Sequence, residues 1–212
     1  VRVGITYPEI YEMQIRAVFD ALVVLTKKKI KAHPQIMIPQ ISSIDELNHI
    51  KKIYDVIKKE TETKHKMKLK INFGTMIEVV RAALTANELA TTAEFFSFGT
   101  NDLTQGTFSF SREDVEGKFL PEYMEKELLE TNPFQSIDES GVGSLIKIGI
   151  SAGRKIRKNM EVGICGEHGG DPKSIKFCHG EGLSYVSASP HRIPIAIVAA
   201  AQAAIEQPKK KK

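Results

Sequence analysis

The chain has 212 residues, of which 42% are hydrophobic, so it can bury the core of one folded domain. Its formal charge of +4 comes from 30 basic and 26 acidic residues, and four of the basic ones are the lysines at 209–212. Without them the charges balance, which argues against nucleic acid or an anionic membrane as the main partner. We expect residues 1–206 to form one domain and residues 207–212 to be a disordered, lysine-rich tail.

Other features of the sequence exclude further classes of protein. No apolar run approaches the roughly 20 residues of a membrane span, and the amino end lacks the pattern of a signal peptide. Cys165 and Cys178 lie outside any C-x-x-C spacing, which argues against a disulfide framework or a zinc site. A reducing compartment fits, so we expect the cytoplasm, with an organelle as the open alternative. Because the chain starts at Val1 without a methionine, we interpret it as a fragment.

Short apolar runs alternate along the chain with amphipathic stretches of helical length. This alternation is typical of βαβ units, which build a parallel sheet. In chain order we expect helix 8–27, strand 35–38, helix 43–61, strand 68–78, helix 79–91, strand 95–102, helix 139–157, strand 162–167, helix 172–180, strand 185–189 and helix 191–206.

Local signals support two of the helix starts. Ser43 and Glu46 have the spacing of a capping box, and Asp171 followed by Pro172 supplies an N-cap with proline in the first turn. Between the third and fourth strands, segment 103–138 is long, polar and rich in turn residues, with a possible short helix at 121–129. A loop of that length in a compact domain is usually functional, so we expect it to border the site.

Two α/β folds fit five βα units. One is a partial (β/α)8 TIM barrel, made of about the last five βα units with the first strands missing, since a complete barrel takes about 250 residues. The other is an open, doubly wound sheet. The number of strands does not separate the two.

Three of the expected strands end in polar residues, which is where α/β folds bind ligands. Glu78 and Asp102 end consecutive strands, so their carboxylates can converge on one point above the sheet. A hard cation such as Mg²⁺ takes one or two carboxylates and keeps its other positions for water and substrate. Alternatively, Glu78 only caps the next helix and Asp102 only starts a turn. The pair together favours a metal site.

The run Gly99, Thr100 and Asn101 comes directly before Asp102. Its backbone N–H groups could approach a carboxylate or a phosphate closely, which makes these residues candidates for binding substrate. The alternative is an ordinary Asn-Asp turn.

Cys165 ends the fourth strand between glycines and polar residues, so its thiol is a candidate catalytic group. His168 is the alternative acid or base, or a residue that only supports the site through hydrogen bonds. We rank Cys165 first. Cys178 falls inside a predicted helix and is expected to be a small buried hydrophobic residue.

Several stretches together resemble the pyruvate, phosphate dikinase family of phosphoenolpyruvate (PEP)-utilising enzymes. Related PEP synthases and the phosphotransferase-system enzyme I share the Gly-x-Asn-Asp core, but the run that contains Cys165 points to the dikinases. The resemblance covers nearly the whole chain before the lysine tail. It is carried by Gly-Thr-Met-Ile-Glu (74–78), Arg-Ala-Ala-Leu-Thr-Ala (81–86), Phe-Phe-Ser-Phe-Gly-Thr-Asn-Asp-Leu-Thr-Gln (95–105), Gly-Lys-Phe-Leu-Pro (117–121) and Val-Gly-Ile-Cys-Gly-Glu-His-Gly-Gly-Asp-Pro (162–172).

The resemblance implies a carboxy-terminal barrel that binds pyruvate or PEP and exchanges a phosphoryl group with a phosphohistidine on a separate domain. In it Glu78 and Asp102 would bind Mg²⁺, and Gly99, Thr100 and Asn101 would contact substrate. Cys165 would move a proton at the methyl carbon, for which we expect a pKa nearer neutrality than the roughly 8.5 of a free cysteine.

The resemblance also implies partners that this sequence does not contain. Full-length family members interconvert ATP, pyruvate and phosphate with AMP, PEP and diphosphate, using an ATP-grasp domain and a phosphohistidine domain, and they form homodimers. Without those domains, and without the arginines that hold the phosphate in the first barrel strands, we expect the fragment alone to be inactive. Two kinds of alternative remain open. One is a related PEP synthase or another Mg²⁺-dependent barrel enzyme that acts on a pyruvate enolate, such as a lyase or aldolase. The other is a truncated, non-catalytic binding or dimerisation module.

Overall fold

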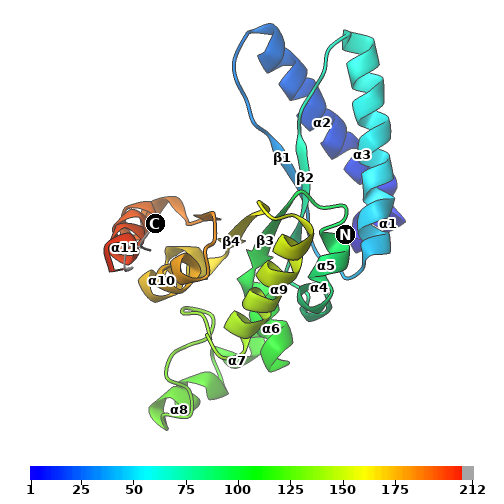
Figure 1. Ribbon diagram of the computed structural model, residues 1–212. Helices are drawn as coiled ribbons and strands as arrows, with labels where there is room; N and C mark the ends of the chain where they lie inside the picture. Colours follow the sequence, from blue (N-terminus) through cyan, green and yellow to red (C-terminus); the bar gives the residue numbers. More distant parts are fainter. Residues whose placement is uncertain (207–212) are drawn as a thin grey trace.

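Five parallel strands lie side by side in the computed structural model, which describes residues 1–206 (Figure 1). Their order in the sheet, β1-β2-β3-β4-β5, is their order in the chain. A doubly wound sheet reverses direction at a switch point, whereas a (β/α)8 barrel adds its strands in sequence. The expected partial barrel is therefore confirmed. The strands are β1 (Gln35–Ile38), β2 (Asn72–Ile77), β3 (Phe95–Gly99), β4 (Glu161–Cys165) and β5 (Tyr185–Val186).

Helices connect each strand to the next, as the sequence predicts. The capping box of Ser43 and Glu46 is present at the start of α3, and the Asp171 side chain accepts a hydrogen bond from the Ser174 N–H at the start of α10. Two 3-10 turns, η1 (Glu167–Gly170) and η2 (Pro190–Arg192), follow β4 and β5. The helices are α1 (Arg2–Thr6), α2 (Pro8–Lys27), α3 (Ile44–His65), α4 (Val80–Leu84), α5 (Ala86–Leu89), α6 (Thr100–Phe108), α7 (Arg112–Val115), α8 (Phe119–Glu125), α9 (Val142–Ile156), α10 (Pro172–Gly180) and α11 (Ile193–Glu206).

Some boundaries differ from the sequence prediction. The third strand ends at Gly99 instead of residue 102, because Thr100 already begins α6. Segment 103–138 is not one long loop, since it contains most of α6 together with α7 and α8. The fifth strand keeps only two residues, and the expected helix 79–91 is divided into α4 and α5 around Thr85. The predicted disordered tail lies outside the described residues.

The outer face of the sheet packs against helices and forms the core. Phe96 and Phe98 of β3 are fully buried there. A Cβ added to Gly153 of α9 would lie 2.7 Å from Phe96 Cε2, and one added to Gly149 would lie 2.9 Å from Phe98 Cζ. Glycine at these positions therefore lets α9 approach the two rings closely, which fixes the helix against β3.

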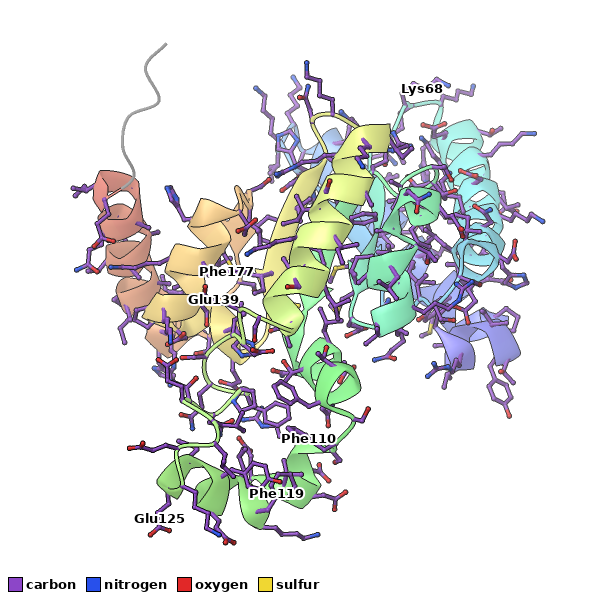
Figure 2. The ribbon with its side chains drawn as sticks, turned by 60° about the horizontal axis from the view of Figure 1, so that its bottom comes forward. Lys68, Phe110, Phe119, Glu125, Glu139 and Phe177 are labelled. Atoms are coloured by element: carbon purple, nitrogen blue, oxygen red, sulfur yellow. The ribbon has the colours of Figure 1, made fainter. Side chains whose placement is uncertain are left out.

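Residues 109–135 form a lobe that extends away from the sheet beyond the end of α6 (Figure 1). A separate small core holds it together, made of Val115, Leu120 and Phe134, with Phe110 and Phe119 packed against them. Figure 2 shows both of these partly buried phenylalanines inside the lobe. No helix within residues 1–206 is long and apolar enough to cross a membrane.

Candidate active site

The carboxyl ends of β2, β3 and β4 place three of the predicted site residues next to each other. Glu78 directly follows β2, Gly99 ends β3, and Cys165 pairs with Gly99 at the end of β4. A Cβ at position 99 would lie 2.6 Å from Glu78 Oε2 and 2.6 Å from Met76 Sδ. Glycine is therefore needed between the Glu78 carboxylate and the Met76 thioether, and any side chain there would displace one of them.

Asp102 lies in the first turn of α6, three residues beyond the end of β3, and not at a strand end as predicted. Its carboxylate still lies close to that of Glu78, since Gln40 forms a hydrogen bond with each of them. The Gln40 N–H donates a hydrogen bond to Glu78 Oε1 at 2.7 Å, and the Gln40 side-chain amide donates to Asp102 Oδ2. The structure thus brings the two predicted carboxylates together around one residue.

Burial raises the pKa of the Glu78 carboxyl group, and the neighbouring Asp102 carboxylate raises it further. The hydrogen bond from the Gln40 N–H acts in the opposite direction. Two carboxylates held this close repel each other, and a divalent cation between them would remove that repulsion. The structure therefore gives a physical reason for a cation at this point.

The donor set decides which cation would fit. Glu78 and Asp102 offer carboxylate oxygens, and Asn101 Oδ1 is buried without a hydrogen-bond partner among residues 1–206. No group of three or more His, Cys, Asp or Glu residues that could hold a metal occurs in that part of the chain. All-oxygen ligation by few protein groups fits Mg²⁺, which keeps several waters or substrate oxygens.

Thr100 is fully buried, and its hydroxyl group contacts protein groups. Its Oγ1 lies 2.6 Å from His168 Nδ1 and 3.1 Å from the carbonyl oxygen of Cys165. These contacts tie the start of α6 to the end of β4. Gly166, which follows Cys165, has φ +104°, and a Cβ there would lie 3.1 Å from Thr100 Oγ1. Both the backbone conformation and the limited space therefore favour glycine at this position.

His168 is fully buried, and both of its ring nitrogens are engaged. Nε2 lies 2.9 Å from the carbonyl oxygen of Pro133, and burial lowers the pKa of the ring. Because a carbonyl oxygen only accepts, Nε2 donates to it, and Nδ1 accepts from Thr100 in the neutral ring. Of the two roles considered for His168, the geometry favours hydrogen-bonded support, which here joins the lobe to the site.

Cys165 is partly exposed on the inner face of the sheet, and its Sγ lies 3.6 Å from the carbonyl oxygen of Phe98. Burial raises the pKa of its thiol, the Glu78 carboxylate adds to the rise, and a hydrogen bond from Ser97 opposes it. The expectation of a pKa nearer neutrality is therefore wrong for this structure. Desolvation disfavours the thiolate, so Cys165 carries its proton at neutral pH. Cys178 is almost fully buried, as predicted.

Three residues of this site were not predicted. Ser97 interrupts an otherwise apolar strand, and that polar residue was the available signal. Gln105 lies one helical turn after Asp102, and its Nε2 donates to Asp102 Oδ1 at 3.2 Å. Gln40 gave no signal, since it is 38 residues before Glu78 in the chain and neither glycine nor asparagine marks its turn.

The fold and the site together define a class of protein. The chain forms a (β/α)8-type domain in which the Glu78 carboxylate and the Cys165 thiol lie at the carboxyl ends of two strands, and the Asp102 carboxylate lies in the first turn of the helix after the strand between them. Such barrels carry their active sites at this end of the strands. A solved structure supports the fold: a citrate lyase from Burkholderia xenovorans matches with a TM-score of 0.54 at 14% identity, covering 81% of this chain and 49% of that one.

Comparison of sequences gives the family. Residues 1–205 match the family model described as PEP-utilising enzyme, PEP-binding domain, so the chain belongs to this family. Pyruvate, phosphate dikinase of Entamoeba histolytica is 53% identical over 99% of this chain and 24% of its own length. The enzyme of the same name from Clostridium symbiosum is 48% identical over 96% of the chain and 23% of its own length. The chain thus spans about a quarter of these curated relatives.

Proposed function

We propose that this chain binds pyruvate or PEP together with Mg²⁺, as one half-site of a phosphotransferase. The observation that carries this proposal is the convergence of Glu78 and Asp102 around Gln40, with the Cys165 thiol at the end of the adjoining strand. Membership in the PEP-binding domain family supports the choice of substrate. Mg²⁺ bound by the two carboxylates would stabilise the negative charge on the enolate oxygen of pyruvate.

The chain's own residues would orient the substrate and move one proton. Asn101 Oδ1 is buried and unpaired at the start of α6, so it is available to a substrate or to a water of the ion. The N–H groups of the first turn of α6 offer donors to a carboxylate or phosphate of the substrate. Glycine at 99 lets the Glu78 carboxylate lie directly against the end of β3, where it can face the ion.

Cys165 would act at the methyl carbon. Its raised pKa keeps the thiol protonated, so the S–H can give its proton to the methylene carbon of the enolate and leave a thiolate. In the opposite direction the thiolate removes a methyl proton of pyruvate and forms the enolate, whose oxygen then accepts the phosphoryl group. Positioned proton transfer of this kind is worth about 10²–10⁴-fold in rate.

The intact protein would supply the rest of the reaction. We propose a phosphohistidine domain and an ATP-grasp domain in the same polypeptide, a homodimeric assembly, and the overall conversion of ATP, pyruvate and phosphate into AMP, PEP and diphosphate. The relatives that carry the name pyruvate, phosphate dikinase are about four times as long as this chain, which leaves room for such domains.

The test is exchange of the methyl protons of pyruvate with solvent, followed by NMR in D₂O with Mg²⁺ and the intact protein. We expect exchange to fall about 10²–10⁴-fold in Cys165→Ala. Cys178→Ala is the matched control and should retain exchange, because Cys178 is buried in α10 as part of the hydrophobic core. Unchanged exchange in Cys165→Ala would show that another group moves the proton.

A further inference from the structure

Gln40 follows β1 and has an unusual backbone conformation for its residue type. Its φ of +57° is left-handed, a region that few residues other than glycine and asparagine adopt. In this conformation the backbone N–H points to Glu78 Oε1, 2.7 Å away, while the side-chain amide reaches Asp102 Oδ2. Gln40 thus contacts one carboxylate through its backbone and the other through its side chain.

Gln105 completes the support of Asp102. Its Nε2 donates to Asp102 Oδ1 at 3.2 Å, while its Oε1 accepts the N–H of Arg112 at 2.9 Å and is thereby held in place. Each oxygen of the Asp102 carboxylate therefore has one amide donor. Since a carboxylate oxygen has two lone pairs, one on each oxygen remains for another partner.

We propose that Gln40 is a positioning residue for the divalent cation, acting through Glu78 and Asp102. This inference rests on the proposed function, because it assumes that the two carboxylates bind the ion. A carboxylate held by amide donors has lost its rotational freedom before the ion arrives, and its free lone pairs point in a fixed direction. The two N–H donors also moderate the repulsion between the carboxylates while no cation is bound.

Gln40 is suited to this role because its amide is neutral. An ammonium or guanidinium group at the same place would compete with the cation for the carboxylates, and a third carboxylate would add to their repulsion. A shorter side chain would leave Asp102 Oδ2 without its donor. Gln40 therefore sets the positions of the two carboxylates before the ion binds, and this role does not require contact with the substrate.

The experiment measures binding of Mn²⁺, used as the probe, by EPR of the free ion in the intact protein. Gln40→Gly is compatible with the left-handed backbone, keeps the backbone N–H that donates to Glu78, and removes only the side-chain amide that donates to Asp102. Gln40→Leu also removes the side-chain amide but keeps a side chain of similar size. We expect both to weaken Mn²⁺ binding about 10-fold, in the range that loss of a support for a metal ligand usually costs. Gln202→Leu on the exposed face of α11 is the matched control and should bind as the wild type does.

Activity supplies a second readout that a merely structural role would not give. In Gln40→Gly we expect the Mg²⁺ concentration for half-maximal rate to rise about 10-fold, with kcat at saturating Mg²⁺ changed less than about 3-fold. A general loss of structure would instead lower kcat at every Mg²⁺ concentration. Unfolding followed by circular dichroism verifies that the variants are folded.

Asp102→Asn separates failure of this inference from failure of the proposed function. If Asp102→Asn loses Mn²⁺ while Gln40→Gly and Gln40→Leu bind it as tightly as the wild type, Gln40 is not a positioning residue and the metal site stands. If Asp102→Asn also binds Mn²⁺ as the wild type does, the ion lies elsewhere and both proposals are wrong.

Discussion

The two faces of the same sheet differ in chemistry. On the outer face, Phe96 and Phe98 of β3 are fully buried against the glycines of α9. On the inner face, Ser97 and Gly99 of the same strand lie beside the Glu78 carboxylate and the Cys165 thiol. Alternation along β3 sends successive side chains to opposite faces, so one strand serves both.

This difference shows how the fold can contain a cluster of polar site residues that does not favour folding. Two adjacent carboxylates and a thiol with a raised pKa contribute little to folding and oppose it in part. The buried phenylalanines supply apolar burial that does not depend on the site. The outer face of β3 therefore contributes apolar burial to stability, and the inner face carries the groups of the site.

The largest expected effect on stability comes from the outer face. Phe98→Ala should lower the free energy of unfolding by about 3–5 kcal/mol, because it removes a fully buried ring that contacts Gly149. Met76→Ala is the matched change on the inner face and should cost less than half as much, since Met76 is only partly buried. Urea unfolding of the intact protein measures both, and equal losses would contradict the division between the faces.

Replacement of Glu78 should have a smaller effect of the opposite sign, an increase in stability. The pKa of Glu78 is higher in the folded chain than the ordinary value of 4.5. The contribution of this group to stability is therefore fully present below pH 4.5 and is lost as the pH rises through the pKa of the folded state. Glu78→Gln avoids that loss and still accepts the Gln40 N–H. Without metal, the variant should unfold at a higher temperature than the wild type at pH 7, and the advantage should shrink toward acid pH.

Thermal unfolding in EDTA at several pH values tests this prediction. Glu9→Gln, on the exposed face of α2, is the control for removal of a negative charge and should show no such trend. A Glu78→Gln variant that is less stable than the wild type at pH 7 would mean that the carboxylate stabilises the fold, so that the inner face shares the structural role.

The smallest expected effect is a shift in the reactivity of Cys165. Because its pKa is raised, alkylation by iodoacetamide should have its midpoint at a higher pH than in a free cysteine. Glu78→Gln removes one cause of the rise and should move the midpoint down. Cys178, buried and with its pKa raised to about 12, should stay unmodified in the folded protein. A Cys165 midpoint below that of free cysteine would contradict the electrostatics of the site.

Much of the fold could be predicted from local patterns. The β1 strand, α2, α10 and the caps at Ser43 and Asp171 have short-range causes: apolar runs, helical spacing, and side chains that reach backbone groups three residues away. The end of β3 was placed three residues too late, because an apolar run followed by Gly-Thr-Asn-Asp does not show where a helix takes over.

The sequence by itself determined the alternation of strands and helices, the family resemblance, and the choice of Glu78, Asp102 and Cys165. Only the tertiary structure decided the order of the strands, which separates a barrel from a doubly wound sheet. It also decided the role of Gln40, whose partners are 38 and 62 residues away in the chain. The physical reason is that hydrogen bonds and burial depend on which segments meet in space, and local patterns record only what neighbours along the chain require.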